Sequence, residues 1–358
     1  MDHRLQLLTR WVSQFPGFAN TTVAPVAGDA SFRRYFRVWR SADLQEPRGV
    51  ERAPGAQADQ AFIVMDAPPE HEDCQPFVTL AQHWRSQGVK VPAIVQQDLA
   101  RGLLLMEDFG DRLLLGQLNT VNADQLYGNA LAELLRIQQL PDNPDDPLAP
   151  YSNDLLDREM ALFRDWLLQR QLGLELNDSD LAMLSNTFTL LRESASAQPK
   201  VPVHRDYHSR NLLVTGGDGR PGVIDFQDAV MGPVTYDLVS LLKDCYVQWP
   251  HERVQNWLES YRQSSLNAGL HSADAATFST WFELMGMQRH LKAAGIFARL
   301  ALRDGKPDYL NDIPRTLGYL CSASGCQPAL RPFHDWLLNT VVPAVEATLG
   351  PVPGAHQP

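Results

Sequence analysis

One short segment constrains this chain more than any other feature of its sequence. Residues 204–211 read HRDYHSRN, and the pair Asp225-Phe226 follows downstream. Transfer of a phosphoryl group needs a carboxylate that receives the proton of the acceptor hydroxyl, and oxygen ligands that hold magnesium on the phosphates. An H-x-D-x-x-x-x-N loop supplies both, with Asp206 as the catalytic base and Asn211 as a magnesium ligand. With Asp225 as the second magnesium ligand, the pattern predicts a phosphotransferase.

The residues on either side of this segment predict short strands. Apolar residues occupy 201–203 and 212–214, and the run at 222–224 leads directly into Asp225. A strand–loop–strand hairpin would therefore present the base and both metal ligands along one edge.

A zinc site is the second interpretation of the same segment. Alternate residues of a strand share one face, so His204, Asp206 and His208 could coordinate zinc, as in a hydrolase. This alternative leaves Asn211 and the Asp-Phe pair without a role. Because the complete pattern would arise by chance in roughly 0.1% of chains of this length, the phosphotransferase interpretation is preferred.

The hydrophobic pattern predicts an α+β chain, with strands near its beginning and helices after them. Strands are expected at 22–27, 32–40, 61–66, 92–97 and 102–107, with helices at 3–15 and 73–87. Further helices are expected at 123–139, 153–171 and 178–195, and over most of 236–348. We predict an N-terminal nucleotide-binding lobe at 1–107, a hinge at 108–112 and a C-terminal catalytic and substrate-binding lobe at 113–358.

Composition limits the class of partner. The net charge of −11 at pH 7 leaves no basic surplus to neutralise a phosphate backbone, so we expect no nucleic-acid partner. No apolar run approaches the roughly 18 residues that cross a bilayer, and the charged start MDHRLQLLTRW lacks the apolar core of a secretion signal. We expect a cytoplasmic protein without a membrane segment, whose cysteines are reduced thiols. No feature of the sequence determines the oligomeric state.

The turn between the first two expected strands, GDASFRR at 28–34, suits the phosphates of a nucleotide. Backbone N–H groups of a tight loop can face phosphate oxygens, and an arginine can pair with their charge. The alternative is an ordinary hairpin whose arginines face solvent. The nucleotide contacts predicted from this turn come from Gly28, Asp29, Ser31, Phe32, Arg33 and Arg34.

The strand at 102–107 is the other nucleotide candidate. It is apolar up to Glu107 and is followed by the turn DFG at 108–110. Backbone groups at Glu107 could pair with adenine in a hinge between two lobes. A plain strand end is the alternative.

These motifs resemble the aminoglycoside phosphotransferase and choline kinase superfamily, whose fold is that of the protein kinases. The resemblance extends from Gly28 to beyond Asp237, and is sharpest in VHRDYHSRNLLV and GVIDFQDAVMGPVTYDLVSLLKDCY. It implies a bilobal fold, with a small, mostly antiparallel sheet lobe and a larger, mainly helical lobe. It also implies ATP and Mg²⁺ as cofactors, Asp206 as the base, and Asp237 as a cap or anchor for the helix behind the loop.

A narrower resemblance is to the anomeric sugar kinases of bacterial cell-wall recycling, on GDASFRRYF, VMDAPPE, HRDYHSRNL, DFQDA and QRHLKAAGIFARL. Those enzymes phosphorylate the C1 hydroxyl of N-acetylmuramic acid and N-acetylglucosamine, which implies a small-molecule amino sugar as the acceptor. The lactyl carboxylate of muramic acid would want a cationic partner, for which Arg210, Arg289, His290 and Lys292 are candidates. The candidates for contact with the acceptor in general are His208, Arg210, Gln227, Asp228, Arg289 and His290.

Several of these residues also have a purely structural interpretation. The segment QRH at 288–290 could be a solvated helix face, and Gln227 and Asp228 could simply shape a turn. The third expected strand ends in MDAPP without the lysine that most kinases place there. Either Arg33 or Arg34 replaces that lysine, or phosphate binding rests on magnesium and the backbone; an arginine is favoured because its guanidinium can bind two phosphate oxygens.

Other functions remain open at this point. The same machinery could act on an aminoglycoside, choline or a hydroxy amino acid, or the chain could bind nucleotide as a pseudokinase without transferring phosphate. A protein kinase is disfavoured, because no long activation segment separates Asp225 from Asp237.

Overall fold

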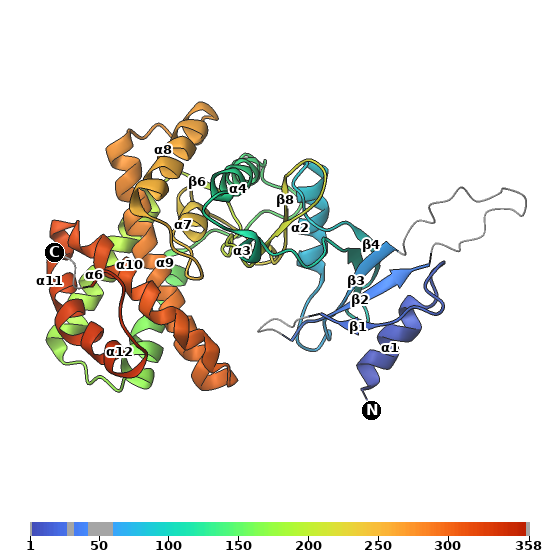
Figure 1. The fold of residues 1–358 in the computed structure, drawn as a ribbon, viewed down its shortest axis with the longest axis horizontal. Helices are drawn as coiled ribbons and strands as arrows, with labels where there is room; N and C mark the ends of the chain where they lie inside the picture. Colours follow the sequence, from blue (N-terminus) through green and yellow to red (C-terminus); the bar gives the residue numbers. More distant parts are fainter. Residues whose placement is uncertain (1, 27–31, 42–59, 356–358) are drawn as a thin grey trace, which may run out of the picture. The chain divides into compact units, whose positions relative to one another are not determined.

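The computed structural model describes residues 2–26, 32–41 and 60–355. The chain divides into two compact units (Figure 1). One consists of Met1–Arg112 with Leu213–Gln227, and the other of Leu113–Leu212 with Asp228–Pro358. The change of unit after Arg112 lies at the end of the expected hinge, whereas the return of 213–227 to the first unit was not predicted. Among the described helices, none is both long and apolar enough to cross a membrane.

The first unit contains a five-stranded antiparallel sheet, in the strand order β1-β2-β3-β5-β4. This is the small antiparallel lobe that the sequence predicted. The pairing of β1 to β2 is brief, because only Ala24 and Pro25 form ladder partners. Its strands are β1 (Ala24–Pro25), β2 (Arg34–Arg40), β3 (Gln60–Asp66), β4 (Ile94–Asp98) and β5 (Leu103–Glu107).

Helix α1 (His3–Val12) packs on this sheet. It starts where the carboxylate of Asp2 accepts a 3.0 Å hydrogen bond from the N–H of Leu5, which satisfies one otherwise unpaired donor of the first turn. The helix is shorter than the expected 3–15, yet Phe15 still packs edge-on against Trp11 at 5.1 Å. The buried core between helix and sheet consists of Leu8, Trp11, Val12, Phe18, Phe36, Val38, Phe62, Val64, Leu103 and Leu105.

Helix α2 (Gln75–Ser86) explains why a distant segment joins the first unit. The ring of Phe226 stacks on Phe77 at 4.9 Å and lies 5.7 Å from Trp84, both of which belong to α2. Strands β7 (Leu212–Val214) and β8 (Pro221–Val223) pair with each other and lead to Phe226. Burial of the three aromatic rings therefore attaches the Asp-Phe pair to the sheet unit.

The second unit is mostly helical. Its longer helices are α4 (Ala123–Gln138), α5 (Asn153–Leu162), α6 (Asp178–Ala197), α8 (His251–Asn267), α9 (Ala275–Asp304) and α10 (Ile313–Gly325). Its shorter ones are α3 (Leu114–Gln117), α7 (Tyr236–Leu242), α11 (Arg331–Trp336) and α12 (Val342–Thr348). The remaining helical turns are η1 (Phe163–Gln171), η2 (Pro307–Asp312), η3 (Pro328–Leu330) and η4 (Leu337–Val341), with β6 (Lys200–Val203) and β9 (Val230–Pro233) as the unit's two-stranded sheet.

The helical span expected at 153–171 is present as α5 followed by the π-helical stretch η1. Another local prediction was wrong. The strands on either side of the HRDYHSRN segment do not form a hairpin, because β6 pairs with β9 and β7 pairs with β8. The partner strand β9 was missed, since its sequence VMGP contains a glycine and a proline.

Helix α9 is the central element of the second unit, in contact with α5, α6, α7, α10 and η1. A side chain at Gly295 would collide with the backbone at the junction of α5 and η1, since its Cβ would lie 2.3 Å from the carbonyl carbon of Leu162 and 2.5 Å from the nitrogen of Phe163. This close approach buries the middle of α9. Residues 288–290 are at most 6% exposed, so the solvated-face interpretation of QRH was wrong.

Candidate active site

The HRDYHSRN segment starts at the end of β6 and is held at its first residues by Asp237. The buried carboxylate of Asp237 accepts backbone hydrogen bonds from His204 at 2.7 Å and from Arg205 at 3.0 Å. Arg205 has a φ of 77°, a strained conformation for a residue with a side chain. Asp237, a residue of α7, therefore ties that helix to the loop, which agrees with the anchoring role expected of it; it does not cap the helix.

His204 and Asn211 brace the loop from within. The imidazole of His204 is fully buried, and its Nδ1 accepts a 3.2 Å hydrogen bond from the N–H of Asp206. The side-chain amide of Asn211 donates to the backbone carbonyl of Asp206 at 3.0 Å. The N–H of Ser209 donates to the carboxylate of Asp244 at 2.9 Å, so a second aspartate, which was not predicted, holds the far part of the loop.

Two cations from α9 lie around the predicted base. The Asp206 side chain is 41% exposed, and its Oδ1 is 3.8 Å from Nη2 of the buried Arg289. Partial burial acts to raise the pKa of Asp206, but Lys292 and Arg289 outweigh it and hold that pKa well below its ordinary value. The carboxylate is consequently ionised at neutral pH and able to accept a proton or a hydrogen bond.

Glu159 of α5 organises these cations, and sequence reasoning missed it. Its buried carboxylate accepts a 2.6 Å hydrogen bond from Arg205 and lies 3.2 Å from Nζ of Lys292. It also accepts hydrogen bonds from the hydroxyl of Tyr151 and, at 3.3 Å, from the amide of Gln288. Burial acts to raise the pKa of Glu159, and the two cations outweigh it, so the pKa is lowered.

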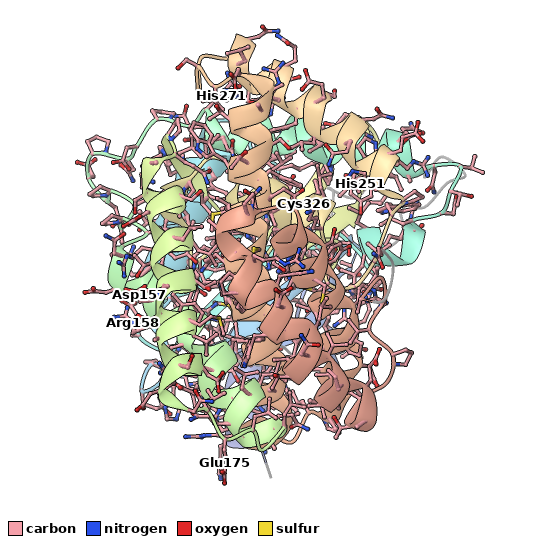
Figure 2. All side chains as sticks on the ribbon, turned by 90° about the vertical axis from the view of Figure 1, so that its left-hand side faces the viewer. Asp157, Arg158, Glu175, His251, His271 and Cys326 are labelled. Carbon is pink, nitrogen blue, oxygen red and sulfur yellow. The ribbon has the colours of Figure 1, made fainter. Side chains whose placement is uncertain are left out.

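A signal for Glu159 was present in the sequence. Asp157 and Arg158 lie on the outside of this unit, where Figure 2 labels them, whereas Glu159 and Met160 are buried. The helical period of α5 places Leu156 and Met160 on its inner face, with Glu159 between them. A carboxylate on the apolar face of a predicted helix is the pattern of a buried ion pair.

Three of the residues predicted to contact the acceptor, His208, Arg210 and Asp228, belong to the second unit. His208 lies edge-on to Tyr246 at 5.3 Å, and burial lowers its pKa to about 4, so the ring is neutral at pH 7. The guanidinium of Arg210 lies 3.7 Å from the centroid of the same Tyr246 ring. The backbone carbonyl of Asp228 accepts a 3.4 Å hydrogen bond from Arg205.

His290 serves packing rather than an acceptor. Its Nε2–H donates to the backbone carbonyl of Lys243 at 2.9 Å, and the ring stacks on Tyr319 with centroids 4.7 Å apart. The residue is 1% exposed. The expected contact of His290 with the acceptor is therefore not supported.

The first unit holds Asp225 and Gln227. Asp225 has a φ of 63°, and its Oδ1 accepts a 2.8 Å hydrogen bond from the side-chain amide of Gln227. A non-glycine residue in the left-handed region is uncommon and is typical of functional positions. The amide of Gln227 thus orients the predicted magnesium ligand within this unit.

The two candidate arginines for phosphate binding have different carboxylate partners. Arg34 alternates in register with Phe36 and Val38, which belong to the α1 core, and it pairs with Asp66 at 2.6 Å and with Asp2 at 2.5 Å. Arg33, just before the strand, is 3.0 Å from Glu72, which precedes α2. The pairs with Asp2 and Asp66 make Arg34 part of the anchorage of α1, whereas the pair of Arg33 with Glu72 lies outside that anchorage. Arg33 is therefore the preferred phosphate candidate.

The other nucleotide predictions have mixed outcomes. Phe32 is 62% exposed and stacks on His71 at 4.5 Å. The N–H of Glu107 donates to the carbonyl of Ala93 at 2.9 Å, so that N–H is occupied within the sheet and is not a donor for adenine. The predicted Gly28, Asp29 and Ser31 lie outside the described residues.

Comparison with known proteins decides the family. Residues 22–276 match the phosphotransferase enzyme family (APH). The chain belongs to this family. Two similar relatives are each named N-acetylmuramate/N-acetylglucosamine kinase. The protein from Pseudomonas putida is 43% identical over 340 residues, covering 92% of this chain and 94% of the relative. The protein from Pseudomonas aeruginosa is 44% identical over 316 residues, covering 88% and 87%.

Several solved structures share the fold of this chain. An ethanolamine kinase from Plasmodium vivax matches with a TM-score of 0.60 at 11% identity, covering 88% of this chain and 84% of that one. The ADP-bound aminoglycoside phosphotransferase APH(2'')-Ib matches with a TM-score of 0.54 at 14% identity, covering 89% and 98%. The expected bilobal α+β kinase-like fold is thereby confirmed.

The oxygen donors of this phosphotransferase suit magnesium better than zinc. Among the described residues, no group of three or more His, Cys, Asp or Glu side chains is arranged to hold a metal, so the zinc interpretation is not supported. Mg²⁺ needs no such group, because one or two protein oxygens combine with waters and phosphate oxygens. Asn211 donates through its amide nitrogen to Asp206, which assigns its oxygen to the other side of the amide, as a metal ligand requires.

Proposed function

We propose that this protein transfers the γ-phosphate of ATP to the C1 hydroxyl of N-acetylmuramate and N-acetylglucosamine, in the cytoplasm, during recycling of peptidoglycan. One observation carries the proposal. The chain is 43% and 44% identical, over about nine-tenths of its length, to two relatives named for kinase activity on these two sugars. Identity of this extent reaches well beyond the loop that all such phosphotransferases share.

Asp206 would position the acceptor and receive its proton. A hemiacetal hydroxyl is more acidic than an ordinary alcohol, so a carboxylate of low basicity can take its proton late in the transfer. The low pKa of Asp206 keeps it ionised for this purpose. The anchoring of its loop by Asp237 and Asp244 limits the motion of the base, and such preorganisation is a large part of phosphoryl-transfer catalysis.

Magnesium and the phosphates would be held by residues on either side of β7 and β8. Asn211 and Asp225 would give oxygen ligands to Mg²⁺, which when bound neutralises charge on the β- and γ-phosphates. Gln227 would hold the Asp225 carboxylate in a fixed orientation through its 2.8 Å hydrogen bond. Arg33 would take the place of the absent third-strand lysine, since its fork can grip two phosphate oxygens.

The surroundings of Asp206 also argue against the alternative acceptors. Choline and aminoglycosides are cations, and a site for them needs an excess of negative charge. Here the base is flanked by Arg289 and Lys292, both less than 10% exposed. These two cations would repel a cationic acceptor, so the site favours a neutral or an anionic one.

The test is transfer from ATP by the purified protein with magnesium, using N-acetylmuramate, N-acetylglucosamine, kanamycin and choline as acceptors. We expect turnover with the two sugars and a phosphorus NMR signal of a C1 phosphate. The Asp206→Asn variant serves as the control for contaminating kinases. Turnover confined to kanamycin or choline would refute the proposed acceptor, and ATP binding without transfer to any acceptor would indicate a pseudokinase.

A further inference from the structure

We infer that Arg289 is the residue that recognises an acidic acceptor, by binding the carboxylate of the lactyl group of N-acetylmuramate. The inference rests on the proposed function and deepens it, because it assigns the discrimination between an acidic and a neutral sugar to one side chain. Three observations support it: the position of Arg289, its unused hydrogen-bonding capacity, and the commitment of the neighbouring cations to other partners.

The first observation is the position of Arg289 beside Asp206. The acceptor hydroxyl must lie against the exposed part of the Asp206 carboxylate, and Nη2 of Arg289 is 3.8 Å from that carboxylate. In N-acetylmuramate the lactyl group is joined to C3 through an ether oxygen, and C3 is separated from C1 by C2 alone. A sugar whose C1 hydroxyl contacts Asp206 therefore carries its carboxylate within reach of a group adjacent to Asp206.

The second observation is that the guanidinium of Arg289 has hydrogen-bond donors without a partner among the described residues. A guanidinium has five N–H donors. Nη2 of Arg289 donates to the hydroxyl of Ser240, and the 3.8 Å separation from Asp206 is too long for a hydrogen bond. Nε is enclosed without a partner, and no described residue accepts a bond from Nη1, which is not enclosed. A buried guanidinium with open donors favours a carboxylate, which can accept two parallel hydrogen bonds from it.

The third observation is that the other cations nearby are committed. Lys292 lies 3.2 Å from Glu159 and donates to the hydroxyl of Tyr236 at 3.1 Å. Arg205 is bound to the same Glu159 at 2.6 Å. Lys292 and Arg205 thus each lie within 3.2 Å of the Glu159 carboxylate that they share, whereas the ion pair of Arg289 with Asp206 spans 3.8 Å.

Arg210 is the remaining competitor. Its guanidinium lies 3.7 Å from the centroid of the Tyr246 ring. Burial raises the pKa of Asp312, and Arg210 and Arg315 oppose that rise. Arg210 is exposed to solvent, where a new ion pair contributes little. A partly enclosed arginine gives a stronger and more selective contact, which favours Arg289.

The experiment compares N-acetylmuramate with its lactyl carboxamide, which has nearly the same size and no charge. We expect wild-type protein to show a kcat/KM for the acid that is roughly 10- to 100-fold higher than for the amide, the value of a hydrogen-bonded charge pair. In Arg289→Met this preference disappears, and in Arg289→Lys it is intermediate. Arg303→Met is the matched control, because Arg303 is an exposed arginine of the same helix that pairs with Asp304.

The outcomes separate the inference from the proposed function. If wild-type protein treats acid and amide alike, or if Arg289→Met keeps the preference, the inference is wrong while the kinase stands. The same holds if Arg210→Met, rather than Arg289→Met, removes the preference. If wild-type protein phosphorylates neither the acid, the amide nor N-acetylglucosamine, the proposed function fails and the inference falls with it. Comparison of acid with amide in the wild type needs no variant, so misfolding of Arg289→Met does not affect it.

Discussion

Oδ2 of Asp237 accepts a 2.7 Å hydrogen bond from the backbone N–H of His204, so a buried residue of α7 holds the start of the loop that carries Asp206. The same carboxylate binds the N–H of Arg205, whose backbone is strained. Removal of the carboxylate would leave both N–H groups without their hydrogen-bond acceptor.

For Asp237→Ala we therefore expect a loss of roughly 2–5 kcal/mol in the free energy of unfolding, with turnover falling even in the folded fraction. Asp237→Asn keeps one acceptor and should lose less. Urea unfolding followed by circular dichroism measures the stability, and active-site titration corrects the rate for unfolded protein. Wild-type stability in Asp237→Ala would contradict the anchoring role.

Replacement of Asp206 by asparagine tests the base. Asparagine keeps the size of the side chain but cannot take a proton, so kcat should fall by about 10²- to 10⁴-fold. Affinity for ATP, measured by titration calorimetry with magnesium, should stay near the wild-type value. Retained turnover, or loss of ATP binding, would contradict the assigned role.

Glu159→Ala should be among the most destabilising single changes in the second unit. It leaves Lys292 and Arg205 as buried cations without their counter-charge, which costs roughly 3–5 kcal/mol. Glu159→Gln keeps the shape and should lose less. Chemical unfolding of both variants gives the comparison, with Asp157→Ala, a partly exposed residue of the same helix, as the control. Equal stabilities of Glu159→Ala and Asp157→Ala would remove Glu159 from the network.

Arg33 and Arg34 are a matched pair on neighbouring positions. Arg33→Met should raise the KM for ATP by about 10- to 100-fold, because a charge-assisted contact to phosphate is lost. Arg34→Met should leave the KM for ATP close to wild type and lower stability by about 1 kcal/mol, since Arg4 still pairs with Asp66. The reverse pattern would reassign phosphate binding to Arg34.

Stability should depend on pH through His290. Burial lowers the pKa of this ring to about 3, and the charges of Lys243 and Arg289 act in the same direction. The hydrogen bonds of the ring to backbone carbonyls oppose that shift. The ring also faces Tyr319. An unfolded histidine titrates near 6.5, so between pH 6.5 and 3 the unfolded state binds a proton that the folded state does not. The stability present above pH 6.5 is lost as the pH falls, by about 1.4 kcal/mol per pH unit.

The measurement is urea unfolding of wild type and His290→Gln at pH 7 and pH 5. Contributions from other groups, including His208, are common to both proteins and cancel in the difference. From pH 7 to pH 5, wild type should lose about 2 kcal/mol more than the variant. Equal losses of stability in wild type and in His290→Gln would show that His290 is protonated in the folded protein.

Much of the fold could be predicted from local sequence. The strand at 212–214 was placed correctly, and the turn of glycines at 216–219 separates it from the next strand, since apolar runs bounded by glycine signal short strands. The loop residues Asp206 and Asn211 were recognisable because their spacing is fixed within one short segment. Their neighbours in the sequence are also their neighbours in space.

Residues that act from a distance were not predictable in this way. The burial of Arg289, the network around Glu159 and the pairing of β6 with β9 each depend on which elements pack together. A sequence period states that a helix has an apolar face, but it does not state which helix covers that face. For that reason the sequence left a solvated QRH segment open as an alternative, whereas the packing of α9 encloses that segment.

The sequence by itself therefore predicted the type of chemistry, because the proposed base, the two proposed oxygen ligands and the loop that spaces them are local properties of the chain. Only the tertiary structure decided the charges around that base. Arg289 and Lys292 reach Asp206 from α9, and Glu159 reaches Lys292 from α5. The physical reason is that an ion pair requires two groups within a few ångströms, and long-range packing alone sets that distance.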